Sequence, residues 1–186
     1  FILLLTVFFV GKLSIAQTIA GGAGHTLFIC GDGSIKSVGL NSQNQLGYQT
    51  SSYQVSLPEK ISSLTGMYSA VSAGREHSLF LKNDGSVWAC GRNDLGACGL
   101  GNITTIVTPI QISGLSGTIT KIAAGSDHSL FLKSNGTVWC SGYNITGQLG
   151  IGNNTNQLTP VQVSNLSNII AIAAGYEFSL FLQNDG

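Results

Sequence analysis

Residues 73–81 read Ala-Gly-Arg-Glu-His-Ser-Leu-Phe-Leu, and this stretch decides the fold because it returns along the chain. Close copies occupy residues 124–132 and 174–182, and a looser copy occupies residues 21–29. An Asp-Gly or Asn-Gly turn follows each copy, with its glycine at position 33, 85, 136 or 186, so that the spacings are 52, 51 and 50 residues. A fixed period of this length is typical of solenoids and propellers.

Each repeat unit reads as four short strands joined by tight turns. In the second unit, two runs rich in β-branched and aromatic residues, 78–82 and 86–90, flank the hairpin signal Asn83-Asp84-Gly85. The alternating run 109–112 begins with a proline, as an edge strand can, and the apolar run 119–124 leads into the next Ala-Gly turn. This pattern predicts an all-β fold of β-propeller blades, each of four antiparallel strands. The expected blades cover residues 17–70, 71–121 and 122–171, and residues 172–186 begin a fourth, so the propeller is expected to be incomplete.

The composition is that of a folded chain with few charges. Of 186 residues, 9% are charged and 25 are glycine, and 8 basic residues balance 8 acidic ones. A disordered chain would be richer in charge and poorer in aliphatic residues. Because the formal net charge is zero, we expect no nucleic-acid partner, since such binding depends on basic residues that neutralise phosphates.

The first ten residues form an apolar run, interrupted only by Thr6, that is too short for a membrane-spanning helix. Ser14 and Ala16 precede Gln17 as the small residues of a signal-peptidase site would. We therefore predict a secretory signal peptide at residues 1–16, a secreted or cell-surface protein, and no membrane span in the mature chain. The alternatives are the stub of a longer segment and a buried strand.

The third unit carries three motifs in a fixed order. They are Ala-Gly-x-x-His-Ser-Leu-Phe-Leu at 124–132, Asn-Gly-Thr-Val-Trp at 135–139 and Gly-x-Asn-x-x-Gly-Gln-Leu-Gly at 142–150. Together they resemble the repeat of the regulator of chromosome condensation family, although the second unit has Ala-Cys-Gly at 97–99 in place of Gln-Leu-Gly. The resemblance covers roughly residues 19–186 and implies a propeller, usually of seven blades. We therefore expect a fragment of a longer propeller, or a chain that closes a ring with a second copy of itself.

The histidines invite a metal or catalytic interpretation, but their repeat position argues against it. His25, His77 and His128 share one position, and Phe178 fills it in the fourth unit. We therefore expect each ring to pack inside the propeller and to bond the backbone of a neighbouring blade. We expect no catalytic residue, no metal site and no cofactor.

The cysteines and tryptophans also have structural explanations. The cysteines stand at four different repeat positions, namely 30, 90, 98 and 140, which indicates small buried side chains, although export would permit a disulfide. Trp88 and Trp139 follow the hairpins, and we expect them to pack between blades. A sugar-stacking platform is the alternative for the tryptophans.

The positions that vary inside the constant frame are the candidates for binding. They lie between the turn glycine and the His/Phe position, and in the middle of Gly-x-Asn. Loops displayed by a rigid scaffold usually carry recognition, whereas the competing interpretation is neutral drift at exposed turns. The candidate protein-binding residues are Arg75, Glu76, Ser126, Asp127, Tyr176, Glu177, Arg92 and Tyr143.

These observations predict an exported, non-catalytic scaffold that binds a protein partner. The best-known activity of the family, guanine-nucleotide exchange on a small nuclear GTPase, is not expected, because it relies on a protruding β-wedge for which the repeat spacings of 50 to 52 residues leave no room. Two alternatives remain open. One is an extracellular enzyme inhibitor, similar to a branch of this architecture that covers β-lactamase active sites, and the other is a propeller appended to a larger secreted enzyme.

Overall fold

The computed structural model describes residues 19–185, and all regular secondary structure in this range is β-strand. The first blade contains β1 (Ile19–Gly21), β2 (His25–Ile29), β3 (Ile35–Leu40) and β4 (Gln54–Lys60). The second contains β5 (Tyr68–Ala73), β6 (His77–Lys82), β7 (Val87–Gly91) and β8 (Ile106–Gln111). The third contains β9 (Ile119–Ala124), β10 (His128–Lys133), β11 (Val138–Gly142) and β12 (Gln157–Gln162), and the fourth begins with β13 (Ile169–Ala174) and β14 (Ser179–Gln183).

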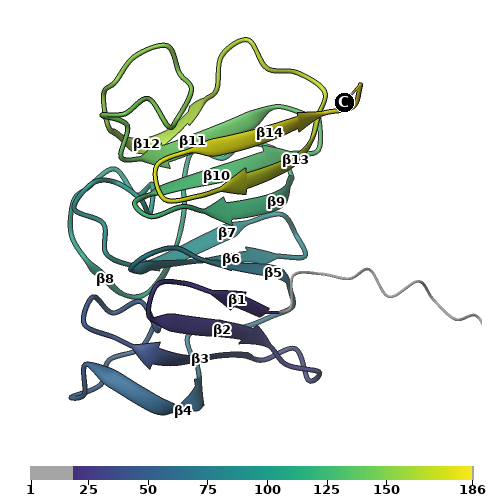
Figure 1. Cartoon of the computed structure of the whole chain (residues 1–186). Coiled ribbons are helices and arrows are strands. Elements are labelled where there is room, and N and C mark those ends of the chain that lie inside the picture. The colour runs from purple at the N-terminus through teal and green to yellow at the C-terminus, as the bar shows by residue number, and fades with distance from the viewer. Residues whose placement is uncertain (1–18, 186) are drawn as a thin grey trace, which may run out of the picture.

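The blades follow one another along the chain as separate antiparallel sheets (Figure 1). This confirms the predicted all-β fold of four-stranded antiparallel blades in an incomplete propeller. None of the described residues forms a helix that is long and apolar enough to span a membrane. The predicted signal peptide at residues 1–16 lies outside the described residues.

The innermost strands of neighbouring blades contact each other, β1 with β5, β5 with β9 and β9 with β13. The first strand of each blade therefore lies at a shared centre, and the following strands lie successively farther from it. The expected blade boundaries at residues 71, 122 and 172 fall inside β5, β9 and β13, which begin at Tyr68, Ile119 and Ile169. The difference arises because the inner strand already starts several residues before the Ala-Gly turn that suggested the boundary.

The second strands of the second and third blades, β6 and β10, are buried on both faces. Leu79 and Leu81 of β6 are fully enclosed, because β6 contacts β9 of the next blade while β5 contacts the previous one. Leu180 and Leu182 occupy the same repeat positions in β14 but are 59% and 49% exposed. In the described chain, only the third blade packs against this last sheet. Since burying a leucine contributes about 1.5–3 kcal/mol, neighbouring blades supply much of the stability of each sheet.

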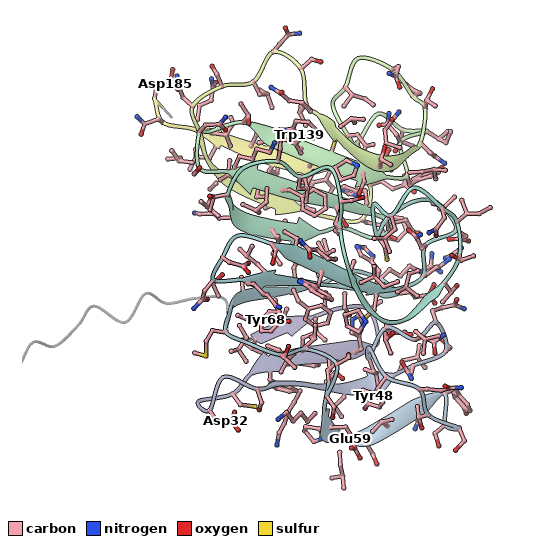
Figure 2. All side chains as sticks on the ribbon, turned by 180° about the vertical axis from the view of Figure 1, so that it is seen from behind. Asp32, Tyr48, Glu59, Tyr68, Trp139 and Asp185 are labelled. Carbon is pink, nitrogen blue, oxygen red and sulfur yellow. The ribbon has the colours of Figure 1, made fainter. Side chains whose placement is uncertain are left out.

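Tight hairpins connect the second and third strands at one end of the blades. Asp84 Oδ1 accepts hydrogen bonds from Ser86 N (2.9 Å) and Ser86 Oγ (2.7 Å), and Gly85 supplies the positive φ of +84° that the turn requires. We call this end, residues 30–34, 82–86, 133–137 and 183–185, the hairpin end. Figure 2 shows Asp32 and Asp185 on this side of the molecule.

A long loop connects the third and fourth strands, and the asparagine of Gly-x-Asn organises it. Asn144 Oδ1 accepts from Leu149 N (2.9 Å), and Asn144 Nδ2 donates to Asn153 O (2.8 Å). Asn93 makes the equivalent contacts in the second blade, with Cys98 N and Asn102 O. In the first blade Asn41 Oδ1 accepts from Leu46 N in the same way, while Asn41 Nδ2 donates to Tyr48 O. The motif therefore specifies the loop conformation.

Candidate protein-interaction face

Two kinds of turn meet at the end of the blades opposite the hairpin end. The Ala-Gly turns, residues 22–24, 74–76, 125–127 and 175–177, join each innermost strand to the second strand. The first residues of the Gly-x-Asn loops, 40–42, 92–94 and 143–145, follow the third strand. One backbone hydrogen bond of 2.7–2.8 Å joins the two turns in each complete blade, donated by Leu40 to Gly24, by Arg92 to Glu76 and by Tyr143 to Asp127. We call this end the turn face, and it lies on the left of Figure 1.

The glycine of each Ala-Gly turn has no room for a side chain. A Cβ on Gly74 would lie 2.3 Å from Cε1 of His77 and 2.5 Å from the carbonyl oxygen of Gly125 in the next blade. Gly22 and Gly125 are equally confined. The turns therefore stack directly against each other at the centre of the propeller, which fixes the backbone that carries the variable residues.

All eight candidate residues lie on the turn face, but they are not equally available. Arg75, Tyr176 and Glu177 are exposed, whereas the remaining candidates apart from Ser126 are half-buried. Ser126 is only 6% exposed, because its hydroxyl donates to Asp127 Oδ2 (2.6 Å) and its backbone N–H donates to the carbonyl oxygen of Gly175 (3.2 Å). Ser126 therefore supports the turn and offers no side chain to a partner.

An ion-pair cluster centred on Arg92 connects the second and third blades. Its guanidinium lies 2.7 Å from Asp94 Oδ2, 3.1 Å from Glu76 Oε2 and 3.6 Å from Asp127 Oδ1. The hydrogen bond to Asp94 and the neighbouring carboxylates raise the pKa of Arg92. Glu76, Arg92 and Asp127 are three of the eight candidate residues, and the structure joins them and adds Asp94.

A hollow of about 380 Å³ opens beside the Ala-Gly turns. Alanine and glycine residues line most of it, and Arg75, Ser126 and Tyr176 complete the lining. The Tyr176 ring is 64% exposed. The hollow is therefore shallow and lined mainly by small residues, with the guanidinium-bearing Arg75 and the aromatic Tyr176 at its wall.

Each histidine belongs to a hydrogen-bond relay between neighbouring blades. His77 Nε2 lies 3.0 Å from Ser129 Oγ in the next blade, and that hydroxyl donates back to the carbonyl oxygen of Ala97 (2.7 Å). The same relay recurs twice, as His25–Ser78–Gln45 and as His128–Ser179–Gln148. The predicted contact with a neighbouring blade is present, but it goes to a serine hydroxyl and not to the backbone.

The relay also assigns the proton positions. A serine hydroxyl has one proton, and Ser129 donates it to Ala97, so His77 must donate from Nε2. Burial lowers the pKa of His77 to about 3 and the pKa values of His25 and His128 to about 4. These imidazoles are therefore neutral at pH 7 and act as donors. Ser129 cannot serve as a nucleophile activated by His77, because a general base would have to accept the serine proton.

The cysteines of the described chain are all free thiols. Cys90, Cys98 and Cys140 are buried, as expected for small apolar side chains, and Cys30 is half-buried. Burial raises the pKa of Cys98 and of Cys140 to about 12. Thiols with such pKa values are poor nucleophiles, because the thiolate is the reactive form.

Trp88 and Trp139 are half-buried and pack against the hydrophobic core that joins the first three blades; Figure 2 labels Trp139. The ammonium group of Lys133 lies 3.8 Å from the centre of the Trp139 ring, and Lys82 lies 4.7 Å from the Trp88 ring. A lysine ammonium group therefore lies over one face of each ring. In residues 19–185, no group of three or more His, Cys, Asp or Glu side chains is placed to hold a metal ion.

The relay serines, Ser78, Ser129 and Ser179, are not among the residues singled out from the sequence. The available signal was that serine follows the His/Phe position in three of the four units, with Thr26 in the first. The signal was hidden because a serine within an apolar strand gives no indication of which loop it reaches. Its acceptor carbonyl lies more than 30 residues away in the sequence.

Comparison with known proteins shows where this architecture occurs. A regulator of chromosome condensation (RCC1) repeat matches residues 32–81, 84–132 and 135–182. Each matched repeat combines the outer two strands of one blade with the inner two strands of the next. The sequence repeat therefore bridges two blades.

Similar proteins include regulators and a receptor. The X-linked retinitis pigmentosa GTPase regulator homolog of Caenorhabditis elegans is 38% identical over 133 residues, which cover 70% of this chain and 10% of that protein. The ultraviolet-B receptor UVR8 of Arabidopsis thaliana is 30% identical over 168 residues, which cover 88% of this chain and 38% of that protein. The chain thus spans less than two fifths of either relative.

Two solved structures share the fold closely. Prp20p from Saccharomyces cerevisiae has a TM-score of 0.81 and 25% identity, with 91% of this chain and 45% of Prp20p covered. Human WBSCR16 has a TM-score of 0.79 and 28% identity, with 91% of this chain and 47% of WBSCR16 covered. Since the repeat matches most of the chain and the blades superimpose on those of Prp20p, the chain belongs to the regulator of chromosome condensation (RCC1) repeat family.

Proposed function

We propose that this chain is a non-catalytic scaffold that binds a protein partner through its turn face. The observation that carries the proposal is that the Ala-Gly turns share one backbone conformation but carry different exposed side chains. The turns keep the same confined glycine, yet the exposed residues that follow it differ from blade to blade. A rigid platform with variable exposed side chains suits recognition of a macromolecule.

The state of the reactive side chains supports a binding role. The histidines donate within buried relays, and the pKa values of the buried thiols are raised. On the turn face, the carboxylates of Glu76, Asp94 and Asp127 surround Arg92. Ser126 Oγ, the hydroxyl that donates to Asp127 Oδ2 (2.6 Å), is buried within its turn. The turn face therefore presents charged and aromatic contacts suited to binding, and its serine–carboxylate pair is enclosed.

The relatives support the same proposal. The solved structure of Prp20p is described together with its binding to Gsp1p and histones, and another structure shows Kap60 bound to yeast RCC1. Gsp1p, histones and Kap60 are thus protein partners of an RCC1-repeat protein. We extend to this chain only the general class, a protein that contacts the propeller surface.

The proposal can be tested by site-specific photo-crosslinking in the native host. A photoreactive phenylalanine analogue in place of Tyr176 should capture one partner reproducibly, whereas the same analogue at the exposed Met67, outside the turn face, should not. The affinity of the captured partner is then measured for Arg75→Ala/Tyr176→Ala and for the matched control Lys60→Ala/Met67→Ala. Arginine and tyrosine anchors often contribute about 2 kcal/mol each, so we expect a loss for the first pair alone. Equal binding by both pairs would contradict the proposal.

We also propose that the protein is exported, on the strength of the apolar run and the small residues at 14 and 16. The matching experiment is fractionation of the native host followed by N-terminal sequencing. We expect the mature protein to begin at Gln17 and to be found outside the cytoplasm. A cytoplasmic protein that retains residues 1–16 would rule out export.

A further inference from the structure

The ionisable side chains are distributed unequally between the two ends of the blades. The strand directions place every lysine of the described chain toward the hairpin end, at positions 36, 60, 82, 121 and 133, and four acidic residues, at 32, 59, 84 and 185, accompany them. The turn face holds the two arginines, at 75 and 92, and four acidic residues, at 76, 94, 127 and 177. The hairpin end therefore has a net charge of +1 and the turn face a net charge of −2; Lys12, outside the described residues, brings the whole chain to neutrality.

The negative charge is concentrated around the junction of the second and third blades. Arg92 alone faces three carboxylates, those of Glu76, Asp94 and Asp127, within 3.6 Å. One guanidinium can neutralise only one of these charges. The cluster therefore keeps an excess of two negative charges that are partly exposed to solvent, and it attracts a cation that can approach from outside.

Apolar surface lies on the same face. The exposed ring of Tyr176 lines the hollow of alanine and glycine residues, and Ile145 of the third Gly-x-Asn loop is 55% exposed. The corresponding residues of the second blade are charged, namely Arg75 and Asp94. Protein interfaces combine aromatic anchors with flanking charges in this way.

We propose that the turn face binds a basic protein segment that also presents an aromatic or aliphatic side chain. Its basic groups lie beside Glu76, Asp94 and Asp127, and its apolar side chain enters the hollow next to Tyr176. This inference rests on the proposed function and adds the chemistry of the partner. Charge complementarity sets the orientation of the segment and the rate of its association, and the apolar side chain supplies the desolvated anchor.

The probe is a library of random twelve-residue peptides displayed on phage, selected against the full-length protein in about 0.15 M salt, an ionic strength at which charge pairs beyond roughly 8 Å are largely screened. Selected peptides are synthesised and titrated against Glu76→Gln/Asp127→Asn. The matched control is Glu59→Gln/Asp84→Asn, which removes the same two charges at the hairpin end. Asparagine already performs the hairpin-turn role of Asp84 in the third blade, where Asn135 Oδ1 accepts from Thr137 Oγ1 (2.7 Å).

We expect the selected peptides to combine Lys or Arg with an aromatic or aliphatic residue. Their affinity should fall roughly tenfold in Glu76→Gln/Asp127→Asn and stay unchanged in the control pair. Acidic or uncharged peptides that depend on Tyr176 would overturn the partner chemistry while leaving the turn face as the binding surface. An empty selection, or peptides that are indifferent to both variant pairs and to Tyr176→Ala, would count against the turn face itself.

Discussion

Replacing Ser129 by alanine should destabilise the junction of the second and third blades more than replacing its histidine partner. Ser129→Ala leaves the Nε2–H of His77 buried without an acceptor and removes the 2.7 Å bond to the carbonyl oxygen of Ala97. A buried donor without a partner costs about 1–3 kcal/mol. The Ala97 oxygen keeps a 3.5 Å contact from Ser141 Oγ, so we expect a total loss of roughly 2–3 kcal/mol in the free energy of unfolding.

His77→Phe should cost less, about 1 kcal/mol, because Ser129 keeps its bond to Ala97 and no buried donor is left unpaired. The double variant should therefore be more stable than the sum of the two single losses predicts, with a coupling of roughly 1–2 kcal/mol. Urea unfolding of the full-length protein at pH 7.5 measures all four forms, and Ser134→Ala at the exposed hairpin end is the matched control. The reasoning is refuted if Ser129→Ala falls within about 0.5 kcal/mol of that control, or if the two losses simply add.

Three further outcomes are expected. His128→Phe should fold and lose about 1 kcal/mol, because Phe178 fills the same repeat position; a variant that fails to fold would show that the ring itself is essential. Stability should be full above pH 6.5 and fall as the pH drops toward 4, because the histidine pKa values of about 3 to 4 in the folded chain lie below the usual 6.5. Below pH 6.5 the unfolded chain binds protons that the folded chain does not, so the free energy of unfolding falls by up to about 1.4 kcal/mol per pH unit for each histidine. Thermal unfolding at pH 7.5, 6 and 5 tests this, and His77→Phe should reduce the pH dependence. Gly74→Ala should lower the melting temperature more than Gly31→Ala, because the new methyl group at residue 74 meets the oxygen of Gly125 at 2.5 Å, whereas Gly31 has open space and no positive φ. Equal effects would show that the Ala-Gly turn can move to accommodate the methyl group.

The architecture could be predicted from the sequence because its signals are local. Asp84-Gly85 and Asn135-Gly136 define hairpins by their own turn chemistry, and the structure has the expected hairpins there, with Asx contacts to Ser86 and Thr137. The blade boundaries could not be predicted as accurately. The inner strand β5 begins at Tyr68, and its first residues are recognisable only through pairing with Lys82 at the far end of β6.

The contacts that hold blades together could not be predicted in the same way. The partner of His77 is a serine 52 residues later, and the partner of Arg92 in the next blade is Asp127. Such pairs are defined by the spacing of neighbouring blades, which depends on packing across the whole junction. Repeat position alone showed that the histidine was structural, but not what it touches.

The exposed turn residues Arg75 and Tyr176 can change because the backbone conformation of the Ala-Gly turns does not depend on their side chains. The backbone N–H of the turn glycine donates to the carbonyl of the His/Phe residue three positions later in all four units, at 2.8–2.9 Å, whether the intervening pair is Ala-Gly, Arg-Glu, Ser-Asp or Tyr-Glu. Even the change from histidine to Phe178 leaves this bond at 2.9 Å. A substitution at Arg75 or Tyr176 therefore alters the chemistry of the turn face while the backbone stays where the glycines and the relays hold it. Selection for a partner can then change the charge and aromatic content at these positions almost independently of folding. Substitutions at these positions are therefore the appropriate test for a basic partner.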